Sequence, residues 1–196
     1  MIAGRLPIIS KERLNKGIRV HVNMKFRELR AASARSKSTV IKSVNEALSK
    51  NKQTAFLCHS HKDHELVKGL QVLLEESGWD LYIDWADTEM PNSPNKETAA
   101  NIKSRITSTD WFLFLATNNS TQSRWCPWEI GLADSIKGYD RILVIPTEDD
   151  SGNWYGNEYL QLYKRIQEGR HSLTGVLGYG AFDAGSESGT MVRFLK

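Results

Sequence analysis

Short apolar runs alternate with segments of helical periodicity from residue 53 to residue 147, and this order restricts the fold more than any other feature. The apolar runs predict strands over 54–58, 79–83, 111–116 and 141–146. Helices are expected between them, one from Leu66 that stops at Gly78 and two over 98–106 and 124–137. Unbroken apolar runs are typical of parallel strands that are covered on both faces. The pattern therefore predicts a doubly wound α/β sheet, to which residues 169–196 would add a last strand and a helix.

Length and composition exclude several classes of protein. At 196 residues, 40% of them hydrophobic, the chain is long enough for one domain with an appendage. No apolar run approaches the roughly 20 residues of a membrane span, and the N-terminus has no compact signal-peptide core. Two cysteines, Cys58 and Cys126, cannot form a disulfide framework. We therefore expect a cytoplasmic protein with no integral membrane segment.

The charge is distributed unevenly along the chain. Residues 1–52 carry 13 lysines and arginines against three acids, a balance of +10, whereas the remainder carries 13 against 20, a balance of −7. We interpret residues 1–51 as a basic extension, helical near 40–48, and residues 52–196 as the domain itself. Such an arm could bind nucleic acid, an anionic membrane surface, or the acidic body of its own or another copy, and it has some features of an organelle transit peptide.

The loops after the predicted strands contain the candidate site. In a doubly wound sheet, ligands bind at the carboxyl ends of the strands, which here are followed by residues 59–64, 84–90, 117–123 and 147–152. Glu129 lies four residues after Trp125, so a helix opened by Pro127 would place the two side chains one turn apart. An aromatic plane beside an acid suits a cationic ring. The alternative is that Glu129 only complements the helix dipole while the tryptophan packs in the core.

These segments resemble a known family in a consistent order. Residues 55–63, AFLCHSHKD, are similar to the first strand and turn of a TIR (Toll/interleukin-1 receptor) domain. Ile83 and Asp84, followed by a long polar loop, resemble the start of the family's BB loop, and residues 106–129 resemble its stretch from third helix to catalytic helix. The similarity covers residues 53–147 and implies the flavodoxin-like parallel sheet of the TIR fold.

The resemblance implies an enzyme that consumes NAD+ as substrate and needs no cofactor or metal. Many TIR domains cleave the bond between nicotinamide and ribose, and their catalytic glutamate corresponds to Glu129. Water, the adenine of the substrate or another acceptor would then give ADP-ribose or a cyclic or conjugated ADP-ribose signal. The same resemblance suggests a set of substrate-binding residues on the strand ends, the BB loop and the catalytic helix: His59, Ser60, Asp84, Trp85, Glu89 and Trp125.

The family also suggests partners and a role. TIR proteins of this bacterial, Thoeris-like type act in anti-phage defence, so we expect self-association or a trigger protein, and a separate effector that responds to the product. Residues 90–94, MPNSP, replace the glycine that many members carry in the BB loop, which puts assembly through that loop in question.

Three alternatives remain open at this level. Residues 59–64, HSHKDH, satisfy the HxHxDH pattern of a zinc hydrolase, although that fold needs further histidines and a different order of elements. A TIR domain can also act as a non-catalytic adaptor, because fold alone does not establish catalysis. Nucleoside deoxyribosyltransferases, which use a glutamate on a related sheet, are a more distant enzymatic alternative.

Overall fold

A computed structural model of the chain describes residues 17–35, 47, 49–84 and 95–196. Its centre is a parallel sheet in which the strands follow the order β4-β3-β5-β6-β8. Of these five strands, the first four along the chain are β3 (Gln53–Cys58), β4 (Leu81–Asp84), β5 (Trp111–Ala116) and β6 (Ile142–Glu148). The predicted strands are confirmed within two residues at each end, and β5 has the predicted bounds. The α/β class is therefore confirmed.

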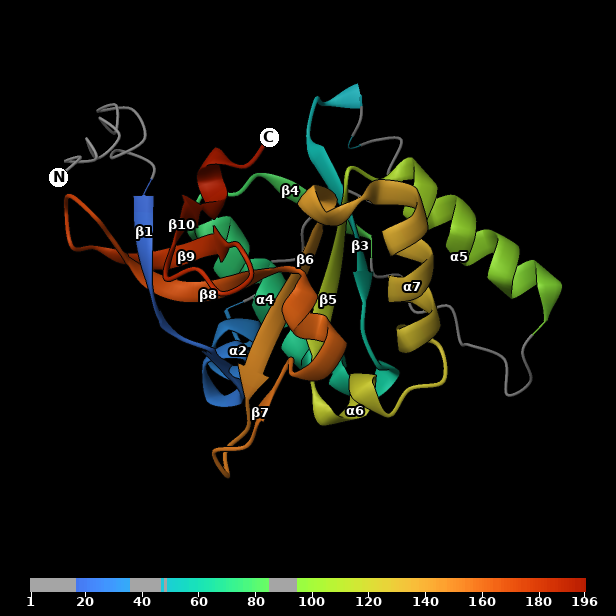
Figure 1. Cartoon of the computed structure of the whole chain (residues 1–196), viewed down its shortest axis with the longest axis horizontal. Coiled ribbons are helices and arrows are strands. Elements are labelled where there is room, and N and C mark those ends of the chain that lie inside the picture. The colour runs from blue at the N-terminus through green and yellow to red at the C-terminus, as the bar shows by residue number, and fades with distance from the viewer. Residues whose placement is uncertain (1–16, 36–46, 48, 85–94) are drawn as a thin grey trace, which may run out of the picture.

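Helices cover both faces of this sheet, which explains the unbroken apolar strands (Figure 1). On one face lie α2 (Phe26–Ser33) and α4 (His64–Glu76). On the other lie α5 (Lys96–Ser108) and α7 (Cys126–Lys137). After α4 the chain reverses at Gly78, whose φ of 80° favours glycine, as predicted.

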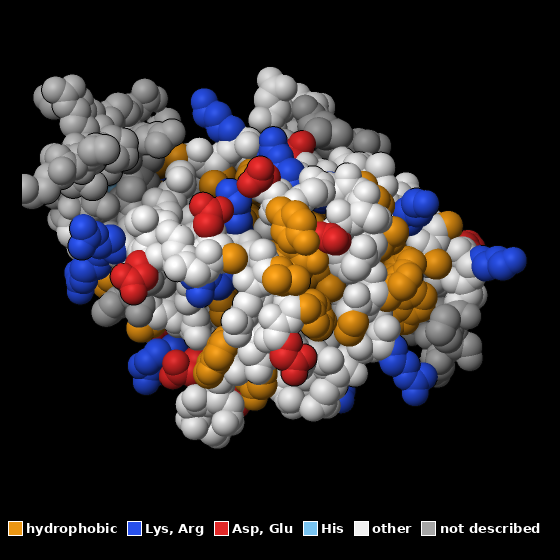
Figure 2. All heavy atoms as spheres, in the orientation of Figure 1, with side chains coloured by type: hydrophobic (Ala, Val, Ile, Leu, Met, Phe, Trp, Pro, Cys, Tyr) orange, Lys and Arg blue, Asp and Glu red, His pale blue; other side chains and the backbone are white. Residues whose placement is uncertain are grey.

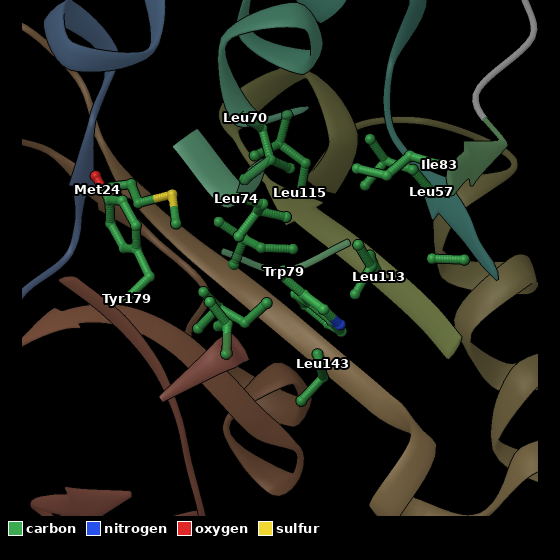
Figure 3. Close-up of a cluster of buried hydrophobic side chains, with 14 of the residues drawn as sticks. Met24, Leu57, Leu70, Leu74, Trp79, Ile83, Leu113, Leu115, Leu143 and Tyr179 are labelled. Carbon is green, nitrogen blue, oxygen red and sulfur yellow. The ribbon is translucent and has the colours of Figure 1, made fainter. Parts of the chain in front are cut away.

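Alternate side chains of the strands enter two cores. Leu57, Leu113 and Leu143 point toward α2 and α4, where they pack with Leu70 and Leu74 (Figure 3). Trp111 is 4% exposed and belongs to this core, packing edge-to-face against Trp79. The neighbours of these residues along the strands, such as Phe112, face α5 and α7. All six side chains of β5 are therefore buried, because the strand lies in the middle of a two-sided sheet.

Short elements close the carboxyl edge of the sheet. The turn η1 (His61–Asp63) follows β3, and α6 (Asn118–Thr121) follows β5. The short strand β7 (Trp154–Tyr155) pairs antiparallel with the end of β6. Two further 3₁₀ turns do not belong to this edge, because they precede the amino ends of β6 and β8. They are η2 (Tyr139–Arg141) and η3 (Glu158–Leu162).

The prediction of a last strand and helix over residues 169–196 is wrong. That region contains the end of β8 (Lys164–His171) and then β9 (Leu177–Phe182), β10 (Ser188–Met191) and the 3₁₀ turn η4 (Val192–Phe194). Strand β8 pairs parallel with β6, but β9 and β10 run antiparallel to their neighbours. Glycines 175 and 185, both at φ near 70°, lie in the turns of these hairpins. The sheet is therefore mixed rather than wholly parallel.

The described part of the basic N-terminal segment is built into the sheet. Strand β1 (Gly17–Val22) pairs antiparallel with β8 and β10, and β2 (Met24–Lys25) pairs parallel with β6. Helix α2 then packs closely on α4, since a Cβ atom on Gly69 would lie 1.8 Å from the carbonyl oxygen of Leu29. The division that we expected at residue 51 differs from this arrangement. Most of the helix predicted near 40–48 lies outside the described residues, although Ala47 is described and buried.

None of the helices in the described part of the chain is both long and apolar enough to cross a membrane.

Candidate active site

Glu129 lies in the first turn of α7, at the carboxyl edge of the sheet. Trp125 is the residue before the helix, and its carbonyl oxygen accepts a hydrogen bond of 2.8 Å from the backbone N–H of Glu129. Pro127 stands in the opening turn, where its missing N–H costs no hydrogen bond. The predicted one-turn spacing of Trp125 and Glu129 is confirmed. The Glu129 residue is only 3% exposed.

Two thiols surround the buried carboxyl group. Cys58 is the last residue of β3 and Cys126 the first of α7, and both are buried and free. Their sulfur atoms and a carboxylate oxygen of Glu129 all lie within 4.8 Å of one another. The thiol of Cys58 donates a hydrogen bond to the backbone carbonyl oxygen of Cys126, with the sulfur 3.8 Å from that oxygen. The carboxyl end of β3 therefore lies beside the Glu129 carboxylate in the first turn of α7.

Burial has the largest effect on the pKa values of both Glu129 and Cys58. It raises the pKa of Glu129 above the usual glutamate range, while the nearby Cys58 thiol, Arg105 and His61 oppose this rise. Burial also raises the pKa of the Cys58 thiol well above its usual value. A cation placed next to Glu129 would favour the ionised carboxylate, since opposite charges at close range stabilise each other.

An ion pair joins α5 to the sheet next to this site. Arg105 donates from Nε and Nη2 to the two carboxylate oxygens of Asp84, at 2.7 and 2.5 Å. Its guanidinium carbon lies 5.5 Å from the centre of the Phe56 ring. The hydrogen bond to Asp84 raises the pKa of Arg105. Asp84, predicted to bind substrate, is thus 7% exposed and engaged through both oxygens.

A buried polar network joins the loops that follow β3 and β5. The Asp63 carboxylate accepts hydrogen bonds from the Thr117 hydroxyl at 2.5 Å and from the Asn119 amide at 2.6 Å. Thr117 also caps α6 by accepting a hydrogen bond from the backbone N–H of Ser120. These contacts hold two neighbouring strand ends in fixed positions beside the candidate site.

The remaining predicted residues lie around this edge. His59 and Ser60 follow Cys58 directly and are half-buried, with His59 Nδ1 3.0 Å from the carbonyl oxygen of Leu57. Trp125 is half-buried and packs edge-to-face against Trp128, with ring centres 5.5 Å apart. Trp85 and Glu89 lie outside the described residues, as does the MPNSP segment. The structure brings His59, Ser60, Trp125 and Glu129 to one edge of the sheet.

The histidine run does not form a metal site in the described part of the chain. Asp63, the acid of the HxHxDH pattern, is bonded to Thr117 and Asn119. Among the described residues, one group of three potential metal ligands is present, and it consists of Cys58, Cys126 and Glu129. The zinc-hydrolase reading of this pattern therefore has no structural support.

Two contacts of the site were missed by the sequence analysis. Cys58 was treated only as a cysteine without a disulfide partner, yet it ends the strand next to β5 and so faces the start of α7. Arg105 was treated as part of a helix, although it follows Ile102 by three residues and therefore shares its inward face. A charged residue on a buried helix face was the available signal for a partner such as Asp84.

The structure is an α/β domain with three buried acids, Asp63, Asp84 and Glu129, at the carboxyl edge of its parallel strands. Comparison with known families agrees, because the model described as TIR domain matches residues 55–172. The chain belongs to the TIR domain family, and the resemblance drawn from its motifs is confirmed.

Two curated relatives carry names of enzymes. The chain is 35% identical over 116 residues to the "Probable 3' cyclic ADP-D-ribose synthase ThsB'" of Bacillus cereus (strain MSX-D12), covering 58% of this chain and 60% of the relative. It is 23% identical over 126 residues to the "Putative cyclic ADP-D-ribose synthase TIR2" of Cytobacillus dafuensis, covering 56% of this chain and 33% of the relative. The chain thus spans less than two thirds of either relative.

Proposed function

We propose that this chain cleaves the nicotinamide–ribose bond of NAD+ and releases ADP-ribose or a cyclic or conjugated ADP-ribose. The observation that carries the proposal is Glu129, a buried carboxylate in the first turn of α7, in a TIR domain similar to proteins named cyclic ADP-D-ribose synthases. Its surroundings favour a cationic partner, and the nicotinamide ring of NAD+ carries a positive charge.

One carboxylate is enough for this reaction. As the bond breaks, the nicotinamide leaves as a neutral ring and needs no proton, while the ribose becomes an oxocarbenium-like cation. Glu129 stabilises that cation electrostatically, which is half of what two carboxylates do in a glycosidase. Attack by water on the ribose gives ADP-ribose, and attack by a group of the substrate itself gives a cyclic product.

Control of the reaction follows from the burial of Glu129. A residue that is 3% exposed reaches a dinucleotide only after the surrounding side chains move. Self-association or a trigger protein supplies this change, and the nucleotide product activates a separate effector in anti-phage defence. This arrangement keeps the idle protein from destroying NAD+.

The test is direct incubation of the protein with NAD+ over a range of protein concentrations, with products identified by mass spectrometry. We expect released nicotinamide together with ADP-ribose or an isomer lighter by one water. Glu129→Gln should lower turnover at least about 100-fold, since the carboxylate acts mainly in the transition state. Glu97→Gln is the matched control, because Glu97 also lies in the first turn of a helix but is exposed. Turnover by Glu129→Gln equal to that of the parent chain would contradict the proposal.

A further inference from the structure

Cys58, Cys126 and Glu129 form a group that the proposed reaction does not fully use. The reaction needs the carboxylate, yet two thiols lie within 4.8 Å of it and of each other. All three residues are at most 3% exposed. They come from the end of β3 and the first turn of α7, two rigid elements that are packed in the same core.

The geometry points to a binding site for a thiophilic divalent cation of the Zn²⁺ type, which binds both sulfurs and the Glu129 carboxylate and so blocks the active site. This inference deepens the proposed function and rests on it for its inhibitory consequence. The binding itself is independent of any reaction with NAD+.

The donor atoms have nearly the separations that such an ion requires. With Zn–S bonds of about 2.3 Å and Zn–O bonds of about 2.0–2.2 Å, tetrahedral ligands lie roughly 3.5–3.8 Å apart. Since no separation in the cluster exceeds 4.8 Å, the atoms need to close by about 1.3 Å at most. Two sulfurs also select Zn²⁺ or Cd²⁺ over Mg²⁺ and Ca²⁺, which prefer oxygen ligands.

The charges of the loaded site are compatible with its position. Binding breaks the two S–H bonds and forms two metal–sulfur bonds and one metal–oxygen bond, and the two thiol protons leave to solvent. A water molecule completes the tetrahedron. Two thiolates, one carboxylate and a divalent ion leave a net charge of −1 at the N-terminus of α7, where the helix dipole favours an anion. Arg105, whose charge acts on Glu129, adds to this effect.

Inhibition follows from shared use of the carboxylate. A metal-bound Glu129 cannot stabilise a sugar cation, because its oxygen is bound to the ion and is no longer free to contact the sugar. The ion and NAD+ therefore compete for one group, and removing the metal restores turnover.

The test begins with the unmodified chain, kept reduced with a phosphine, and uses Co²⁺ as a spectroscopic probe and then Zn²⁺ with a chromophoric chelator. We expect one metal per chain and a sulfur-to-cobalt charge-transfer band together with the intense d–d absorption of tetrahedral cobalt. Absence of the charge-transfer band at a two-fold excess of Co²⁺ overturns the inference, whether or not any variant folds.

Variants then locate the site. The double variant Cys58→Ser and Cys126→Ser should bind Zn²⁺ at least about 100-fold more weakly, since it loses two ligands. His64→Gln is the matched control for binding at the histidine run of residues 59–64 and should bind Zn²⁺ as the parent chain does. Affinity that falls in His64→Gln and not in the cysteine variant overturns the inference. Circular dichroism confirms that each variant is folded.

The two proposals fail in different ways. If the metal-free chain leaves NAD+ intact but binds Co²⁺ through sulfur, the catalytic proposal fails and the metal site stands. If NAD+ is consumed and one equivalent of Zn²⁺ neither binds through sulfur nor lowers turnover, the metal site fails and catalysis stands.

Discussion

A carboxylate buried against two thiols makes the stability of the fold depend on pH. Burial raises the pKa of Glu129, so the folded state holds its proton more tightly than the unfolded state does. The stability that this proton contributes is fully present below the unfolded value near 4.5 and is lost as pH rises through the folded pKa.

Glu129→Gln should remove this dependence. The neutral side chain has no proton to lose, so the free energy of unfolding of the variant, relative to the parent, should increase as pH rises from about 4 to 8. Urea unfolding at several pH values, with a chelator present, measures the difference. A difference that stays constant over this range would show that burial of the charge costs nothing.

The ion pair of Asp84 and Arg105 should also contribute to the stability of the fold. Asp84→Asn leaves the guanidinium without a carboxylate in a half-buried position and should destabilise the fold by about 1–3 kcal/mol. Because the pair is joined by two hydrogen bonds, the loss in a double variant with Arg105→Gln should be smaller than the sum of the single losses. Thermal unfolding of the three variants measures this coupling, and strict additivity would contradict it.

At the scale of elements, the contact between α2 and α4 depends on a residue without a side chain. Gly69→Ala would push its new methyl group into the carbonyl of Leu29, so the helices must separate. We expect a loss of about 1–3 kcal/mol, as in other overpacked cores. Gly131→Ala is the matched control, since it adds the same group to α7 with no atom within 4 Å and should leave the fold equally or more stable. Equal effects of the two substitutions in urea unfolding would contradict the close approach.

Elements with strong periodicity were predictable, and elements defined by tertiary pairing were not. The runs that became β3, β5 and β6 were clear because strands buried on both faces have no polar alternation. Strands β9 and β10 contain three glycines and lack a continuous apolar run, so their pairing with β8 and β1 follows from hairpin turns and close backbone approach. Strand β1 lies in a basic segment whose charge suggested a separate arm, and its partners are more than 140 residues away.

In the candidate site, too, the local features were predictable and the tertiary contacts were not. The position of Glu129 was predictable from local spacing, because Pro127 and Trp125 fix the start of a helix. Its contact with Cys58 depends on two segments about 70 residues apart and on the parallel register of β3 and β5. Sequence patterns report local geometry well, but they contain no direct record of which strand end faces which helix.

At the scale of the whole molecule, the N-terminal segment should be needed for folding. A chain that begins at residue 52 would lose β1, β2 and α2, and with them Ile18, Met24 and Leu29, which are all fully buried. The newly exposed apolar surface of α4 and the free edges of β8 and β10 should cause aggregation or a large drop in melting temperature. A chain that begins at residue 17 keeps these elements and is the comparison. Calorimetry on both would show whether the truncation at 52 folds normally, which would contradict an integral role.

One face of the molecule exposes a group of large apolar side chains. Apolar side chains gather over α7 and the neighbouring η3 on one face (Figure 2). The exposed large hydrophobic residues include Trp128, Tyr139, Tyr159 and Leu162. Such a face is a candidate surface for the self-association included in the proposed function.

The central claim is that Glu129 breaks the nicotinamide–ribose bond. Its most direct test is the release of nicotinamide from NAD+ by the metal-free chain, compared with Glu129→Gln and Glu97→Gln at equal concentration. Nicotinamide and one ADP-ribose product should form at equal rates with the parent chain and with Glu97→Gln, and at least about 100-fold more slowly with Glu129→Gln. Undiminished release by folded Glu129→Gln would contradict the account.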